Sequence, residues 1–182
     1  MKAITLTIVI GLIGFSLCGQ TKFTTHDATI SFFSDAPVED IQAESKKGRG
    51  GIDLLSGQVL FVVPINSFVF DKSLMQKHFN ESYIESHLYP VARFEGRFTQ
   101  PVDTATRSLQ TLPFSGRLTI HGVTKMINER ATVRYDTDKI TAKSIFMVKT
   151  ADFNIKIPRI LIKNIAEEIR IEINADLIPA TP

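Results

Sequence analysis

The chain has 182 residues, of which 43% are hydrophobic and 22% are charged, and these are ordinary values for a globular domain. Without the leader described below it carries 20 basic and 19 acidic residues. This near neutrality excludes nucleic acids and anionic membrane surfaces as electrostatic partners. The length suits one domain that needs neither disulfides nor metals to bury a core.

The first residues have the pattern of a secretory signal peptide. Lys2 precedes an apolar stretch at 4–17 that is too short to span a bilayer comfortably. We therefore expect a signal peptide at 1–19 and a mature domain at 20–182 that is periplasmic or secreted and has no membrane span. Cys18 is the only cysteine, and the residue before it is too large for a lipobox, so we do not expect a lipid anchor.

Alternation of apolar and polar residues recurs along the rest of the chain and predicts β-strands. Phe94 and Phe98, for example, alternate with charged residues on the opposite face of the same run. Each such strand has one dry face and one wet face. The runs lie at 22–33, 37–44, 52–66, 91–99, 107–121, 126–136, 139–150 and 168–177.

Three segments between these runs carry turn signals. Residues 122–125 and 136–138 are short connections, which predict hairpins and antiparallel neighbours. Residues 45–51 contain three glycines and three basic residues, which predict a solvated loop. We therefore expect an antiparallel meander.

One segment follows a helical period instead. Met75, Phe79 and Tyr83 are spaced by four residues, which places them on one face of a helix. Residues 73–76 fit a capping box at its start, and Pro90 bars its continuation. We expect a lid or plug helix of about three turns.

Eight one-faced antiparallel strands must bury their apolar sides against each other. A closed barrel does so and removes open sheet edges, whereas a two-sheet sandwich is the alternative. Several of the strands are long, which favours the barrel. We therefore predict an all-β fold, an antiparallel eight-stranded barrel with one short lid helix.

Motifs for catalysis, metal binding or cofactor binding are lacking in the sequence. The four histidines have no short metal-type spacing, and neither a nucleophile elbow nor a mature cysteine is present. Alternation puts His121 on the polar face opposite Leu118 and Ile120, where we expect it to hydrogen-bond near a turn. An enzyme that uses His121 or His78 on small apolar molecules remains the competing hypothesis.

Three segments resemble signature segments of the YceI-like family, which are exported proteins regarded as binders of polyisoprenoids and related lipids. The segments are LTIHGVTK at 118–125, LMQKHFNESYIESHLYPVARFEG at 74–96 and ADFNIKIP at 151–158. One departure is residues 126–128, where the family commonly has Pro-Val after the lysine. The resemblance implies a lipocalin-like barrel with an elongated apolar tunnel, a helix near its mouth and no catalytic part for His121.

From this resemblance we expect the protein to sequester or carry one long-chain apolar lipid, of polyisoprenoid or isoprenoid quinone type, inside the barrel, without catalysis and without a metal or cofactor. Core packing is an equal alternative for each candidate wall residue, and a filled barrel would indicate a stress-linked interaction module instead. The sequence leaves open the identity of the lipid and whether the protein forms a homodimer. The candidate lipid-binding residues are Phe61, Val63, Met75, Phe79, Tyr83, Phe94, Phe98, Phe114, Leu118, Ile120, Phe146 and Val148.

Overall fold

The computed structural model describes residues 21–37, 39–157 and 165–181, so the predicted signal peptide and Cys18 lie outside the described residues. The strands within these ranges are β1 (Lys22–Ser34), β2 (Ile41–Asp53), β3 (Gln58–Pro64), β4 (Val69–Phe70), β5 (Val91–Phe98), β6 (Gln110–Ile120), β7 (Val123–Asp136), β8 (Lys139–Lys149) and β9 (Glu168–Pro179). The helical elements are η1 (Ile65–Ser67), α1 (Ser73–His78), η2 (Phe79–Tyr83) and η3 (Thr150–Phe153).

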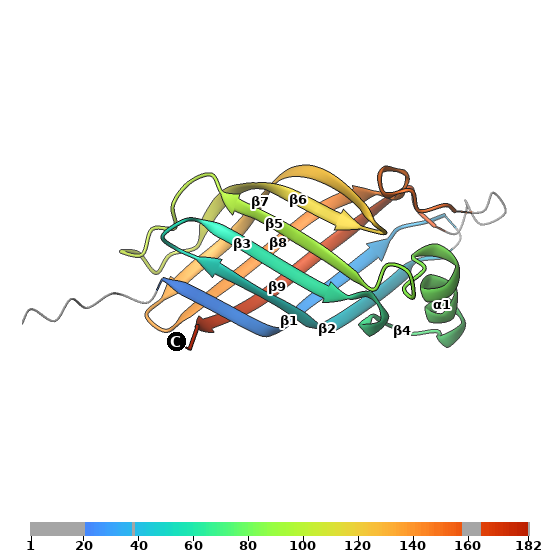
Figure 1. Cartoon of the computed structure of the whole chain (residues 1–182), viewed down its shortest axis with the longest axis horizontal. Helices are drawn as coiled ribbons and strands as arrows, with labels where there is room; N and C mark the ends of the chain where they lie inside the picture. The colour runs from blue at the N-terminus through green and yellow to red at the C-terminus, as the bar shows by residue number, and fades with distance from the viewer. Residues whose placement is uncertain (1–20, 38, 158–164, 182) are drawn as a thin grey trace, which may run out of the picture.

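Eight of these strands close into an antiparallel barrel. The ring runs β1, β9, β8, β7, β6, β5, β3, β2 and back to β1, and β4 pairs with β2 outside the ring. The barrel is elongated, with α1 at one end and the C-terminus at the other (Figure 1). The predicted eight-stranded antiparallel barrel with a short helix is therefore confirmed, and the sandwich alternative is not the fold.

Alternation along β9 shows why these sequences close into a barrel. Ala175 and Leu177 are buried at 4% and 0% exposure, while Asp176 between them faces solvent. Ile171 and Ile173 continue the inward face towards the other end of the strand. A strand with one apolar face gains stability only when that face is covered, and closure covers all eight faces together.

The expected loop at 45–51 is wrong, because these residues belong to β2. A Cβ on Gly50 would lie 2.4 Å from the ring of Phe61, and one on Gly48 would lie 2.6 Å from the carbonyl oxygen of Ala28. The glycines therefore allow neighbouring chain segments to approach β2 closely, which is a use of glycine in strands rather than in loops.

Two further boundaries differ from the sequence-based expectation. The run expected at 52–66 is divided by a turn, so β3 begins only at Gln58, and the short β4 follows as an additional strand. The hairpin expected at 122–125 turns at His121 and Gly122, whose φ angles are 51° and 72°. Two consecutive left-handed residues form the tight turn that matches strand twist, so β7 begins at Val123.

The lid combines α1 with a π-helical turn, η2, and together they cover the three turns expected at this place. The capping box at 73–76 is wrong, because the N-cap residue is Lys72 and no side chain caps the helix. The side-chain oxygen of Gln76 instead accepts a hydrogen bond from the backbone N–H of Phe70 at 3.3 Å. This bond attaches the helix to β4.

The interior of the barrel is divided into two halves. In the half far from α1, which we call the filled half, the core includes Val133, Ile140 and Leu177, all at 0% exposure. In the half beneath α1, which we call the lid half, a separate cluster includes Val63 and Phe68. The candidate functional site lies in the lid half.

Candidate functional site

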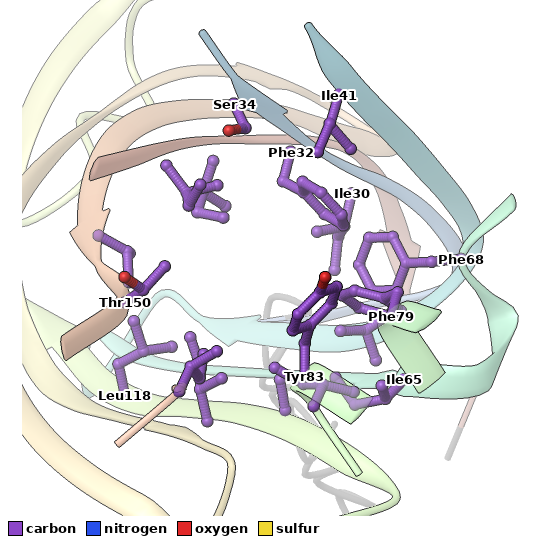
Figure 2. Close-up of a pocket in the computed structure, with 18 of the residues that line it drawn as sticks. Ile30, Phe32, Ser34, Ile41, Ile65, Phe68, Phe79, Tyr83, Leu118 and Thr150 are labelled. Carbon is purple, nitrogen blue, oxygen red and sulfur yellow. The ribbon is translucent and has the colours of Figure 1, made fainter. Parts of the chain in front are cut away.

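An apolar cavity occupies the lid half of the barrel. It comprises about 1230 Å³ of space free of protein atoms, including the part that opens to solvent. Figure 2 shows side chains from several strands and from the lid arranged around an empty centre. The wall contains Ile30, Phe32, Ile41, Phe61, Val63, Ile65, Phe68, Phe70, Met75, Phe79, Tyr83, Ile84, Ala92, Phe94, Leu118, Ile120, Phe146, Val148, Ile155, Ile157, Ile165, Ile169, Ile171 and Ile173.

Most of the candidate residues from the sequence lie on this wall. The structure brings together Phe61, Val63, Met75, Phe79, Tyr83, Phe94, Leu118, Ile120, Phe146 and Val148. Phe98 and Phe114 do not line the cavity, because both are buried in the filled half at 6% and 8% exposure. Strand alternation correctly predicts that both side chains point into the barrel. Their position along the barrel axis, which alternation does not predict, places them outside the cavity.

Sequence reasoning missed part of the wall. Ile30 on β1 and Ile171 and Ile173 on β9 belong to alternating runs, so their inward direction was readable from the sequence. Phe68 and Phe70 carry no such signal, because β4 has only two residues and shows no period.

Phe94 marks the boundary between the cavity and the filled half. Its ring lies over a glycine pair, Gly96 and Gly116, which face each other on β5 and β6. A Cβ on either glycine would lie 2.6 Å from the tip of the Phe94 ring. Below it, the Phe114 ring packs edge to face at 5.2 Å. Because neither glycine has a side chain, the Phe94 ring can lie on the sheet. In this position the ring closes the bottom of the cavity.

An aromatic cluster holds the lid on one side. The ring of Phe79 in η2 stacks on Phe32 at 5.4 Å and contacts Phe70 at 5.0 Å and Phe68 at 6.0 Å. Aromatic pairs at such distances add specific geometry to the burial of apolar area. The predicted lid residue Phe79 is thus an anchor of the lid as well as a part of the wall.

His121 holds the segment that follows the lid. Its Nδ1 lies 3.1 Å from the carbonyl oxygen of Phe153, and its Nε2 lies 3.0 Å from a carboxylate oxygen of Glu85. The ring thus lies between two acceptor oxygens, one from η3 and one from the segment after η2. The ring also contacts Tyr89 at a centroid distance of 4.4 Å. We call His121, Glu85 and the Phe153 carbonyl the clasp.

The clasp gives His121 a structural place. As expected, His121 hydrogen-bonds near a turn, but it lies in the turn itself rather than on the polar face of the strand, and its side chain is only 10% exposed. Neither His121 nor Glu85 lines the cavity, and His78 is exposed on α1. A histidine beside a carboxylate therefore exists, but it does not face the space where a ligand would lie.

Two hydroxyls on the cavity wall are committed to the backbone before β9. The hydroxyl oxygen of Ser34 accepts the N–H of Ala166 at 2.8 Å, and the hydroxyl of Thr150 donates to the carbonyl oxygen of Glu167 at 3.3 Å. Both side chains are therefore used to hold the chain that leads into this strand.

The other polar wall residues are Arg93 and Tyr83. Arg93 is exposed and pairs with Glu95 on the outer face of β5, so its charge lies outside the barrel. The Tyr83 hydroxyl forms no hydrogen bond with any residue that the structure describes, and Figure 2 shows it within the ring of wall side chains. Burial raises the pKa of the Tyr83 phenol. Among the described wall residues, Tyr83 is thus the one whose polar side chain has no partner within the described chain.

Across residues 21–37, 39–157 and 165–181, no three His, Cys, Asp or Glu side chains are grouped so that they could hold a metal ion. In the same ranges, no helix combines the length and apolar character needed to cross a bilayer.

Comparison with known proteins identifies the family. The model of the YceI-like domain matches residues 9–177. The chain belongs to the YceI-like family. No curated protein matches this YceI-like chain.

Solved structures share its fold at low sequence identity. A polyisoprenoid binding domain from Saccharophagus degradans, implicated in plant cell wall breakdown, has 17% identity and a TM-score of 0.74, and the match covers 88% of this chain and 99% of that chain. BcnA from Burkholderia cenocepacia has 18% identity and a TM-score of 0.69, with 85% and 96% covered. The YceI protein of Campylobacter jejuni has 17% identity and a TM-score of 0.64, with both chains covered completely.

Proposed function

We propose that this YceI-like protein binds one long apolar lipid of isoprenoid type in the lid half of its barrel. The apolar cavity carries the proposal, because its wall offers hydrocarbon on every side. Each methylene removed from water contributes about 0.8 kcal/mol, so about fifteen carbons supply roughly 12 kcal/mol. The lower estimates of the free-energy cost of association are ~4 kcal/mol. The remaining free energy, about 8 kcal/mol, corresponds to micromolar affinity.

The comparisons support a lipid as the ligand. The family model matches most of the chain, and the Saccharophagus degradans structure is described as a polyisoprenoid binding domain. A binding role without covalent catalysis is also supported by the position of His121 and Glu85, which lie outside the cavity. The proposed role is therefore sequestration or transport of the lipid.

The same proposal includes export. Residues 1–19 have the charge and the apolar run of a signal peptide, which supports a periplasmic or secreted protein. Protein recovered from the extracytoplasmic fraction is expected to begin near residue 20 by N-terminal sequencing. Recovery of the chain only from the cytoplasm, with Lys2 retained, would contradict export.

The ligand itself is tested by what the protein retains. Mature protein purified from an exporting host is expected to release a long-chain isoprenoid on solvent extraction, identified by mass spectrometry, and native mass spectrometry is expected to show one lipid per chain. A protein that carries no lipid and also fails to bind a fluorescent isoprenoid would contradict the proposal.

The site is tested by filling the cavity. Ile171→Trp places an indole in the space that a chain would occupy, and loss of contact with two methylenes already weakens binding by about tenfold. The matched control is Ile145→Trp, because residue 145 pairs with the neighbouring position 172 but is 44% exposed on the outer face. Equal binding by both variants and the unmodified protein would place the lipid elsewhere.

A further inference from the structure

Tyr83 places a polar hydroxyl group in a cavity whose wall is otherwise mainly apolar. It is the last residue of η2, and its hydroxyl oxygen points into the space enclosed by the wall side chains (Figure 2). The described part of the chain provides no hydrogen-bond partner for this hydroxyl. A polar group that leaves water on ligand binding without a partner costs free energy, so a ligand that supplies a partner is favoured.

The lid holds Tyr83 from both sides. Phe79, four residues earlier, is packed among the rings of the aromatic cluster, and Glu85, two residues later, is bound by His121. Ile84 beneath it is 5% exposed, and its N–H bonds the carbonyl oxygen of Phe79 at 3.0 Å. The backbone that carries Tyr83 is therefore held in place before the ligand arrives, which favours a directed hydrogen bond.

The surroundings of Tyr83 define which polar group fits. The guanidinium of Arg93 lies outside the barrel with Glu95, and no other wall residue in the described chain is ionisable apart from Tyr83 itself. Among the residues that the structure describes, no countercharge lines the cavity to compensate an ionised phosphate or carboxylate for its lost hydration. A pure hydrocarbon would leave the Tyr83 hydroxyl unpaired.

We propose that Tyr83 selects an uncharged lipid whose polar group is a carbonyl acceptor, such as a ketone or an ester, and donates a hydrogen bond to it beneath the lid. The inference rests on the proposed lipid-binding function and adds the chemical class of the polar group. The apolar part of the same ligand occupies the space between β1, β5, β6, β8 and β9, whose side chains form the wall.

The test uses two probes of the same shape. Pristane is a branched isoprenoid hydrocarbon, and phytone is the ketone in which a carbonyl replaces one of its methyl-bearing carbons. Each displaces an uncharged fluorophore such as Nile red from unmodified protein, from Tyr83→Phe and from Tyr135→Phe. Tyr135 is the matched control, because it does not line the cavity and its ring packs against Phe23 at 6.0 Å.

Tyr83→Phe is expected to weaken phytone binding by about three- to tenfold and to leave pristane binding within about twofold. Tyr135→Phe is expected to change neither. The affinities of two variants are compared for the same probe, so the difference in hydration free energy between the two probes cancels. Phytanic acid, which is ionised at neutral pH, is expected to bind unmodified protein at least about tenfold more weakly than phytone.

The outcomes separate this inference from the proposed function. Pristane binding tests the apolar cavity alone, so its failure with every protein overturns the function. If pristane binds and Tyr83→Phe binds phytone like the unmodified protein, the role of Tyr83 is overturned while the function stands. An equal loss for phytone and pristane in Tyr83→Phe reduces Tyr83 to a structural residue, and phytanic acid binding as tightly as phytone overturns the uncharged class.

Discussion

The filled half and the lid half of the barrel are built from the same strands but use apolar side chains differently. In the filled half, phenylalanines such as Phe98 and Phe114 lie inside the ring and pack with Val133 and Leu177. In the lid half, the rings of Phe32 and Phe79 belong to a cluster at the side of the barrel that anchors the lid. The centre of the lid half is therefore left empty.

The comparison shows that apolar content does not decide whether a barrel is hollow. Both halves are lined by phenylalanine and branched aliphatic residues. An eight-stranded barrel is near the size at which side chains can just fill the interior. What differs is whether the large rings pack within the core or gather beside the lid. β9 crosses both halves and allows this difference to be measured along one strand.

Leu177→Ala is expected to have the largest effect of the variants considered for this comparison. The Leu177 side chain is 0% exposed in the filled half, so truncation leaves a cavity among close-packed neighbours. The free energy of unfolding is expected to fall by about 2–5 kcal/mol in urea titrations. A loss below about 1 kcal/mol would show that the filled half is loosely packed, and it would contradict the difference in packing between the two halves.

His121→Asn is expected to have the next largest effect, confined to the lid half. Asparagine tolerates the left-handed backbone at this position, so the change removes the clasp rather than the turn. Loss of the ring contacts to Glu85 and Phe153 is expected to lower the local stability by about 1–2 kcal/mol. Hydrogen exchange should therefore accelerate at residues 84–89 but not in β7 and β8, and uniform acceleration would contradict a local clasp.

Ile171→Ala is the direct counterpart of Leu177→Ala on the same strand. Ile171 faces the cavity and is half-buried, so its side chain already lacks neighbours on one side. Its truncation is expected to lower the free energy of unfolding by only roughly 1 kcal/mol, measured in the same urea titrations. A loss equal to that of Leu177→Ala would indicate that the lid half is packed like the filled half.

Glu172→Gln, on the outer face of β9, is expected to have the smallest effect. The hydrogen bond from Lys143, followed by that from Asn174, holds the pKa of Glu172 below its usual value. A lowered pKa in the folded state stabilises the protein at neutral pH, and this contribution is lost as the pH falls through the folded pKa. The variant should lose less than about 1 kcal/mol at pH 7.

Two measurements check the Glu172 prediction. The difference in the free energy of unfolding between the variant and the unmodified protein should disappear in acid, because the carboxyl is then protonated in both states. Glu168→Gln is the control, since its carboxylate is exposed and has one longer ion pair, to Lys149 at 3.5 Å. A difference that persists in acid would assign the effect to packing instead of charge.

Alternation predicted the barrel because each strand has one face to bury. The same pattern could not reveal the cavity, since Phe94 and Phe98 share one face of β5 and one core cluster, but only Phe94 lines the cavity. Periodicity predicts which side of a strand points inward. It carries no information about how far the opposing side chains reach across the barrel.

Two features that differ from the sequence-based expectation have a common physical origin. Glycines at 48 and 50 suggested a loop because their role in β2 depends on Ala28 and Phe61, which are distant in sequence. The place of His121 likewise depends on Glu85 and Phe153 across the barrel end. Such tertiary contacts leave no local period, so a single sequence does not display them.

The position of the chain ends in the fold has a practical consequence. The carbonyl oxygen of Thr21 accepts the N–H of Leu54 in the β2–β3 turn, and the N–H of Ala180 bonds the carbonyl oxygen of Lys22. Both described ends are thus fixed at the end of the molecule opposite α1 (Figure 1). A tag or a surface linker joined at either described end would therefore lie at the filled half, away from α1 and from the cavity in the lid half.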